Sequence, residues 1–274
     1  MSIKSLIKDW LPPAVLHALQ PLRGGGNRFK GDYAKWEDAA AQCTGYDAAP
    51  ILAKVLESTL KVKRGEAAYE RDSVLFDKAE YAWPVTAALM WVAAQDGGRL
   101  DVLDFGGALG SIYFQNRVFL ANLPQVRWSV IEQAHYVQAG REYIQDETLR
   151  FYSSTDDCLS ENKPNVVLLS SVLQYLPEVD SVIKQINRSD ANIIIIDRTP
   201  FSDEIFDKIC MQSVPESIYE ANYPMKIFSL KGFIANFRDW NIIQEISSPE
   251  GSLLTKAGLS INFRGFIMKR KNVS

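Results

Sequence analysis

The stretch Asp104-Phe-Gly-Gly-Ala-Leu-Gly110-Ser111 follows a short apolar run at residues 100–105 and precedes a helical pattern at residues 112–120. A strand, a glycine-rich turn and a helix in this order are typical of an open parallel sheet, where ligands bind beyond the carboxyl ends of the strands. The glycines let the backbone approach a ligand and expose the amides of the next helix. The stretch therefore predicts a nucleotide-type cofactor site in an α/β fold.

Further strand-like runs continue this alternation along the chain. They lie at residues 126–131, 149–152, 165–169 and 191–196, with helical segments between them. Together with the first run they give five β-then-α units, which indicate a parallel sheet covered by helices. Two more runs, at 241–246 and 261–267, are joined by a Ser/Pro/Gly-containing loop, which predicts a hairpin. We expect a Rossmann-like, seven-stranded, mostly parallel sheet with an antiparallel final hairpin.

The rest of the chain adds an N-terminal helical region to this sheet. We expect an amphipathic segment and Gly-rich linker at residues 1–29, a helical cap or substrate region at 30–98, and the sheet domain at 99–274 with a lid-like, irregular insertion at 200–228. Helical spacing is clearest at 49–62 and 80–95, and residues 30–98 carry no strand signal. The helix expected in residues 1–22 either packs on protein or lies on a membrane surface. Liposome binding that is unchanged by deletion of residues 1–26 would exclude the membrane interpretation.

Composition limits the possible partners. The 274 residues include 30 Lys+Arg and 33 Asp+Glu, for a formal net charge of −3, so nucleic acid is not an expected partner. Three dispersed cysteines indicate a reducing compartment, and two distant histidines argue against a metal site. With neither an 18-residue apolar run nor a secretory signal, we expect a cytoplasmic protein. No pattern specifies an oligomeric state.

Two acidic residues favour one cofactor class over another. Glu132 lies 22 positions beyond Gly110, directly after the second strand-like run, where a carboxylate can accept hydrogen bonds from ribose hydroxyls. Asp104 precedes the first glycine by two residues and would repel the pyrophosphate of a dinucleotide. S-adenosylmethionine brings no phosphate, and its ammonium can be balanced by an acid. The pattern D-x-G-x-x-x-G therefore predicts S-adenosylmethionine, although Ala108 stands where a glycine is common. A turn that needs glycine only for close packing is the alternative.

Three segments carry a family resemblance. They are Asp104–Gly110, Val130-Ile-Glu-Gln133 and the Ser170-Ser-Val-Leu-Gln-Tyr-Leu176 motif, and they resemble class I S-adenosylmethionine-dependent methyltransferases. From about residue 30 onward the chain is also similar to a family of bacterial methyltransferases found with surface-polysaccharide biosynthesis genes. That similarity is carried by Gly45-Tyr-Asp47, Tyr69–Asp77, Trp83-Pro84, Tyr113–Arg117, Asp197–Phe201, Ile218-Tyr219 and Asn222–Pro224. The resemblance implies an enzyme that methylates a saccharide or another small acceptor, most simply on oxygen.

The resemblance also implies roles for single residues at the cofactor. The methionine end of the cofactor would contact Asp104, Gly106, Gly107 and Gly110. The ribose would contact Glu132, and the adenine would contact Gln133, Ser154 and Thr155. The methyl group would lie next to Ser170 and Ser171. Ser154 and Thr155 stand where the class often has an acid, so the adenine contact departs from the usual pattern.

Candidate catalytic residues lie at the fifth strand end and in a charge cluster. Asp197 follows four isoleucines and is a candidate base for an acceptor hydroxyl; an ion pair with Arg198 or a helix cap is the alternative. Glu70, Arg71 and Asp72 form a charged run, which is either a solvated face or a segment over the pocket mouth, where Arg71 would hold an anionic acceptor group. Gln174 occupies a place where small-molecule methyltransferases often have histidine, which excludes a histidine base there.

Two other functions remain open from the sequence. One is an NAD(P)-dependent sugar-nucleotide oxidoreductase or epimerase, against which stand Asp104, the absence of a Tyr-x-x-x-Lys pair and the final hairpin. The other is a non-catalytic partner protein of a polysaccharide assembly complex.

Overall fold

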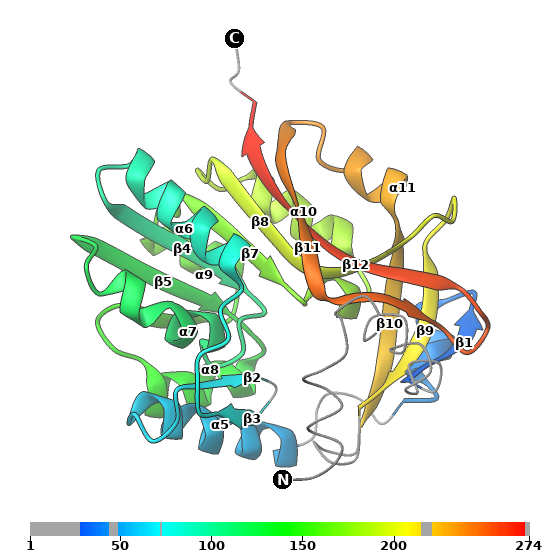
Figure 1. Cartoon of the computed structure of the whole chain (residues 1–274), viewed down its shortest axis with the longest axis horizontal. Helices are drawn as coiled ribbons and strands as arrows, with labels where there is room; N and C mark the ends of the chain where they lie inside the picture. Colours follow the sequence, from blue (N-terminus) through cyan, green and yellow to red (C-terminus); the bar gives the residue numbers. More distant parts are fainter. Residues whose placement is uncertain (1–27, 44–48, 72, 215–220, 272–274) are drawn as a thin grey trace, which may run out of the picture.

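The computed structural model describes residues 28–43, 49–71, 73–214 and 221–271 (Figure 1). The strands are β1 (Phe29–Tyr33), β2 (Tyr69–Arg71), β3 (Val74–Phe76), β4 (Arg99–Phe105), β5 (Gln125–Ile131), β6 (Leu149–Tyr152), β7 (Val166–Ser170), β8 (Ile193–Ser202), β9 (Lys208–Ser213), β10 (Asn222–Ser229), β11 (Trp240–Leu254) and β12 (Ser260–Arg270). The helices are α4 (Trp36–Ala40), α5 (Ala49–Lys63), α6 (Trp83–Gln95), α7 (Ser111–Leu120), α8 (Ala134–Ala139), α9 (Thr155–Glu161), α10 (Val179–Asn187) and α11 (Leu230–Ala235), with short turns η2 (Gly140–Ile144) and η3 (Leu173–Tyr175).

The predicted sheet is present. Strands β6, β5, β4, β7 and β8 lie side by side and are parallel, and β12 pairs antiparallel with β8 and with β11. These seven strands confirm the Rossmann-like, mostly parallel sheet with an antiparallel final hairpin. The order reverses at β4, which lies between β5 and β7, so the chain leaves β4 and β7 toward opposite sides. The carboxyl ends of these two strands therefore border the crevice in which such sheets bind ligands.

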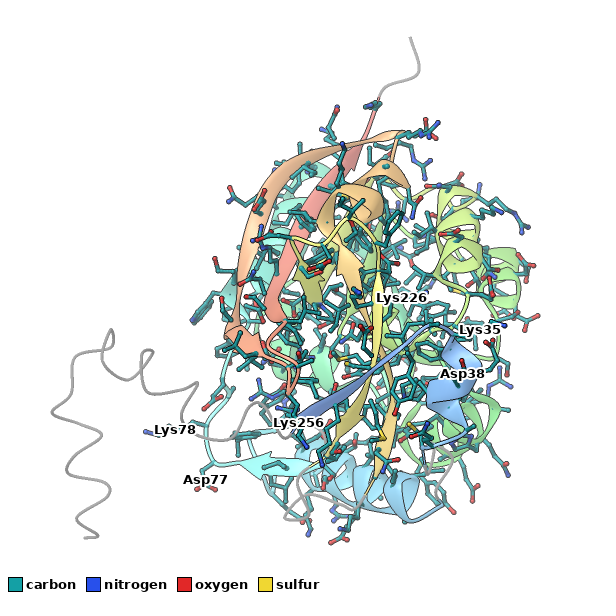
Figure 2. The ribbon with its side chains drawn as sticks, turned by 90° about the vertical axis from the view of Figure 1, so that its right-hand side faces the viewer. Lys35, Asp38, Asp77, Lys78, Lys226 and Lys256 are labelled. Carbon is teal, nitrogen blue, oxygen red and sulfur yellow. The ribbon has the colours of Figure 1, made fainter. Side chains whose placement is uncertain are left out.

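Three strands that the sequence analysis did not predict enlarge the sheet to ten. β8 continues past Asp197, and its last residues pair in parallel with β10, at Phe201 with Phe228 and at Ser202 with Ser229. β9 pairs with β10, and β1 pairs with β9, both antiparallel. Figure 1 shows these strands on the opposite side of the molecule from β4 and β5. Figure 2 shows their outer side, with Lys226 on β10 and Lys35 and Asp38 at α4.

Two predictions from the sequence are therefore wrong in part. Residues 30–98 contain strands as well as helices, because β1 joins β9 and because β2 and β3 form a separate hairpin. The described part of residues 200–228 is not irregular, since β9 and most of β10 lie in it. Both segments become strands through partners far away in the chain, which local periodicity does not reveal. The division of the chain near residues 29 and 98 stays a prediction.

Alternating side chains of the central strands enter two cores, one on each face of the sheet. Val102 of β4 belongs to the core under α5, α6 and α7, whereas the next residue, Leu103, belongs to the core under α9, α10 and α11. Ile195 and Ile196 of β8 divide in the same way. A strand covered on both faces must be apolar throughout, which is why these strands read as continuous apolar runs.

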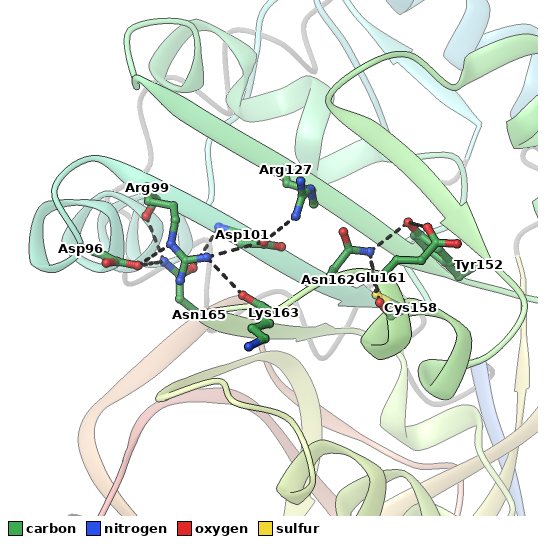
Figure 3. A network of polar contacts seen from close by, with 10 residues as sticks. All are labelled: Asp96, Arg99, Asp101, Arg127, Tyr152, Cys158, Glu161, Asn162, Lys163 and Asn165. Atoms are coloured by element: carbon green, nitrogen blue, oxygen red, sulfur yellow. Dashed lines mark hydrogen bonds and ion pairs between the residues drawn. The ribbon is translucent and has the colours of Figure 1, made fainter.

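A polar network fixes the amino end of the sheet (Figure 3). The side-chain oxygen of Asn165 accepts from the backbone N–H of Asp101 at 2.9 Å, and its amide donates to Asp96 at 2.9 Å. Arg127 lies 3.4 Å from the Asp101 carboxylate, which is 1% exposed. Burial raises the pKa of Asp101. These contacts tie β4 to the segment before β7 at the edge opposite the glycine turn.

No helix within the described residues is long and apolar enough to cross a membrane. The amphipathic segment expected in residues 1–22 lies outside the described residues.

Candidate active site

A cavity of about 1030 Å³ lies beyond the carboxyl ends of β4, β5, β6 and β7. One end is lined by the glycine turn, Glu132, Gln133, Ser154, Thr155, Ser170 and Ser171, and we refer to it as the glycine-turn end. The opposite end is lined by Phe29, Trp36, Tyr175, Tyr223 and Phe263, and we refer to it as the aromatic end. The structure thus brings together most of the residues predicted to bind a cofactor. Gly110 shapes the turn but is not part of the cavity wall.

The turn after β4 depends on glycine at two positions. Gly106 has φ +72°, and a Cβ there would lie 2.3 Å from Val172 Cγ2. Gly110 has φ +89° and precedes the first residue of α7. Ala108, where the sequence departs from the common glycine, has φ +49°, a conformation that is costly for a residue with a Cβ. The turn is therefore both closely packed and strained where it meets the cavity.

Asp104 supports the turn from below. Its carboxylate is 1% exposed and accepts a hydrogen bond from Trp128 Nε1 at 2.9 Å. A Cβ at Gly107 would lie 2.4 Å from Asp104 Oδ2, so the turn rests directly on this carboxylate. Burial raises the pKa of Asp104 to about 7; the Trp128 hydrogen bond opposes this and the charge of Glu132 adds to it.

Glu132 binds the same turn from β5. It accepts hydrogen bonds from the backbone N–H of Ala108 at 3.3 Å and of Gln133 at 2.7 Å. Burial raises the pKa of Glu132, and the two backbone hydrogen bonds oppose this shift. One amide of the glycine turn is thus already directed at a carboxylate.

Ser154 and Thr155, two of the three residues predicted near the adenine, differ in their environment. Ser154 caps α9 by accepting from the backbone N–H of Asp157 at 3.1 Å. Thr155 is 2% exposed and lines the cavity, and its hydroxyl has no hydrogen-bond partner among the described residues. A buried hydroxyl of this kind is satisfied when a ligand offers a donor or acceptor.

Asp197 is placed behind the cavity wall. It is 4% exposed, accepts from Ser170 Oγ at 2.9 Å and lies 3.4 Å from Arg198 Nε. Burial raises its pKa, while Arg198 and Ser170 oppose the shift. Ser170 and Arg198 line the cavity, and Asp197 does not. The ion pair with Arg198, one of the alternatives from the sequence, is present. The role of Asp197 as a base stays a prediction.

Gln174 is also buried and outside the cavity wall. Its side-chain amide donates to Ser171 Oγ at 3.1 Å and to the Arg198 carbonyl at 3.3 Å. Ser171 (φ +54°) and Arg198 (φ +48°) are left-handed, as Ala108 is. Three strained non-glycine residues thus line the cavity, after β4, after β7 and within β8, and such residues are common at functional sites.

Two residues of the charged run, Glu70 and Arg71, belong to β2 of the β2–β3 hairpin and line the cavity. Glu70 is 1% exposed and accepts a hydrogen bond from Ser111 Oγ, so a solvated face is wrong for this residue. Arg71 lines the cavity, and its guanidinium lies 5.8 Å from the Phe76 ring centroid. Asp72 lies outside the described residues. The alternative of a segment over the pocket mouth agrees with the position of the hairpin.

Sequence reasoning missed most of the aromatic end. The Tyr175 hydroxyl donates to Gln212 Oε1 at 3.0 Å, and the Tyr175 ring packs edge-on against Tyr223 at 5.1 Å. Within the insertion expected at residues 200–228, Tyr223 lines the cavity, while Phe201 is in the core. Apart from Tyr175, the side chains that line the aromatic end come from β1, α4, β10 and β12. No single stretch of sequence contains the signal.

No protein-family model matches the chain, and the search among curated proteins also gives no match. Solved structures give more remote likenesses. The N-terminal domain of EvdMO1, solved with SAH and D-fucose, is 13% identical, with 80% of this chain and 97% of that chain covered and a TM-score of 0.48. CalS10, an amino pentose methyltransferase from Micromonospora echinaspora solved with SAM, is 13% identical, with 70% and 92% covered and a TM-score of 0.43. A Burkholderia thailandensis 1,6-didemethyltoxoflavin-N1-methyltransferase is 13% identical, with 89% and 100% covered and a TM-score of 0.41. All three TM-scores are below 0.5, so these likenesses carry no argument about function. The proposed function is argued from the geometry of the site.

Proposed function

We propose that this protein is an S-adenosylmethionine-dependent methyltransferase. The observation that carries the proposal is the meeting of carboxylates with the glycine turn. Asp104 lies beneath Gly107, and Glu132 accepts from the N–H of Ala108. A pyrophosphate would lie against two acids and compete with Glu132 for an amide. S-adenosylmethionine carries a sulfonium and an ammonium and no phosphate, so these acids favour it.

The residues at the glycine-turn end fit the parts of this cofactor. Glu132 would accept from the ribose hydroxyls, and Gln133, Ser154 and the unpaired hydroxyl of Thr155 would border the adenine. The methionine end would lie along Gly106 and Gly107, where the backbone packs closely on Val172 and Asp104 and still borders the cavity, and before Gly110. Ser170 and Ser171 would lie beneath the methyl group. When bound, the cofactor supplies an electrophilic methyl group.

For the acceptor, we propose a saccharide or another small molecule that is methylated on oxygen during bacterial surface-polysaccharide biosynthesis. Aromatic side chains such as Tyr223 and Phe263 offer faces on which a sugar ring can stack. Arg71 lines the cavity and suits an anionic group of the acceptor. Methyl transfer is an in-line displacement, so positioning supplies much of the rate. Asp197, through its contacts with Ser170 and Arg198, would hold two residues of the cavity wall.

A titration calorimetry experiment separates this proposal from a nicotinamide-dependent function. We expect S-adenosylhomocysteine to bind and NADH to give no heat. Asp104→Ala should weaken S-adenosylhomocysteine binding by about 1–3 kcal/mol, the cost of losing a buried hydrogen-bonding group that supports the turn and leaving Trp128 Nε1 without its acceptor. Binding of NADH without S-adenosylhomocysteine would instead support the oxidoreductase or epimerase.

A second experiment addresses the non-catalytic alternative. Transfer of a labelled methyl group from S-adenosylmethionine to saccharides of a cell extract is expected for the enzyme. Cofactor binding without transfer to any saccharide would favour a partner protein of an assembly complex.

A further inference from the structure

We propose that Glu70, on the β2–β3 hairpin outside the main sheet, binds the ammonium group at the methionine end of the cofactor. This inference rests on the proposed function and adds a residue to its cofactor site. It also makes the hairpin a structural part of that site.

Glu70 lies where the glycine turn passes into α7. Its carboxylate accepts a hydrogen bond from Ser111 Oγ, and Ser111 is the first residue of α7, directly after Gly110. Glu70 and Ser111 both line the cavity together with Gly106 and Gly107. The carboxylate therefore reaches the turn along which the methionine end would lie.

The hairpin holds this carboxylate in a fixed place. The backbone N–H of Ser73 donates to Glu70 Oε2 at 3.3 Å, and Ser73 has φ +66°. The carbonyl of Ser73 accepts in turn from Ser58 Oγ of α5 at 2.8 Å. A strained turn anchored by a helix positions Glu70 without a ligand, which lowers the ordering cost when one binds.

Glu70 is better suited to a cation than the two acids of the sheet. Asp104 accepts from Trp128 beneath the turn, and with its pKa raised to about 7 by burial it is only partly ionised at neutral pH. Glu132 is directed at the Ala108 amide, on the side where the ribose would lie. Glu70 is 1% exposed, and a carboxylate attracts a cation more strongly in a buried place than in water.

The experiment compares two probes that share adenosine and sulfur. S-adenosylhomocysteine has the amino-acid end, and 5′-methylthioadenosine lacks it. Calorimetry of Glu70→Gln should show an affinity for S-adenosylhomocysteine that is lower by about 10- to 100-fold. Its affinity for 5′-methylthioadenosine should stay within about twofold of wild type. The amide keeps the size of the side chain and an oxygen for Ser111, so the change isolates charge.

Two variants serve as controls. Glu132→Gln should weaken both probes, because both carry the ribose. Glu66→Gln alters a glutamate that is close in sequence, half exposed and paired with Arg64, so it should change neither probe.

The outcomes distinguish a failure of the role proposed for Glu70 from a failure of the proposed methyltransferase function. Equal losses for both probes, or no loss for S-adenosylhomocysteine, overturn the role of Glu70 and leave the methyltransferase proposal standing. Failure of wild type to bind either probe overturns the proposed function itself. If Glu70→Gln does not fold, Ser111→Ala takes its place. Removal of the hydroxyl that orients Glu70 should then weaken S-adenosylhomocysteine selectively, by several-fold, and an unchanged affinity contradicts the proposal.

Discussion

The two ends of the cavity are built in different ways. Successive strands and the turns that follow them form most of the glycine-turn end, which is polar and holds the carboxylates of Asp104 and Glu132. The aromatic end is assembled from β1, α4, β10 and β12, together with Tyr175 of η3, so its side chains come from both halves of the chain.

The difference teaches which part of the site the sheet itself determines. In a parallel sheet every carboxyl end falls on one edge, so residues that follow β4, β5 and β7 must meet. The aromatic end needs the extension of β8 to Ser202, where β10 can pair. Substitutions at the first end should therefore affect cofactor binding, and substitutions at the second should leave it intact.

The largest effect is expected for Gly106→Ala. The new Cβ would lie 2.3 Å from Val172 Cγ2 at φ +72°, so the turn must shift. We expect S-adenosylhomocysteine affinity to fall on the order of 100-fold, and the free energy of unfolding to fall by about 1–3 kcal/mol. Calorimetry and urea unfolding measure the two effects. The control is Gly232→Ala in α11, where the nearest atom is 3.6 Å from the new Cβ: the affinity should be unchanged, and the free energy of unfolding should stay the same or rise by up to about 1 kcal/mol. Wild-type affinity in Gly106→Ala would remove the turn from the site.

A smaller effect concerns the dependence of stability on pH. Burial raises the pKa of Asp104 from 3.8 to about 7, so the folded protein holds this proton more tightly than the unfolded chain. The stability that Asp104 contributes is therefore full below about pH 4 and lost as pH rises to about 7, by at most about 1.4 kcal/mol per pH unit. Asp104→Asn should flatten the decline between pH 5 and 7 in urea unfolding. Asp101 and Asp197 are present in both proteins and cancel, whereas Glu132 interacts with Asp104, so the difference measures the titration of Asp104 together with its coupling to Glu132. Identical slopes would contradict the shift.

The smallest effect is expected at the aromatic end. Tyr175→Phe removes the hydrogen bond to Gln212 and keeps the ring against Tyr223. We expect the free energy of unfolding to fall by about 0.5–1.5 kcal/mol and S-adenosylhomocysteine affinity to stay within about twofold. Loss of affinity as large as that of Gly106→Ala would show that the two ends do not act separately.

The same contrast explains what the sequence could predict. The strand at 149–152 coincides with β6, because its apolar residues and the flanking turns are local signals. β1 contains Gly31 and Asp32, and β10 contains Pro224, which lacks a backbone N–H. These segments do not favour strands by themselves. They form strands because they pair with strands far away in the chain, as Phe29 of β1 does with Gln212 of β9.

Whether a single site residue could be predicted also depends on whether its signal is local in the sequence. Asp104 could be identified because a strand, an acid and the glycines are adjacent in sequence. For Glu70 the charged run leaves a solvated face and a segment over the pocket mouth both open, and its hydrogen bond with Ser111, 41 positions away, has no local signal in the sequence. The ion pair of Asp197 with Arg198 could be anticipated as an alternative, but its place behind the wall depends on β7 and β12.

The pairing of β1 with β9 has a consequence for synthesis on the ribosome. Phe29 cannot find Gln212 until that residue has left the exit tunnel, roughly 10 to 40 s after Phe29 itself at the usual rates of translation. Strands β4 to β7 emerge earlier and can pair in the meantime. Phe29, which is 1% exposed in the folded protein, spends this interval without its partner strand, so its aromatic side chain stays accessible to solvent and to chaperones until β9 arrives.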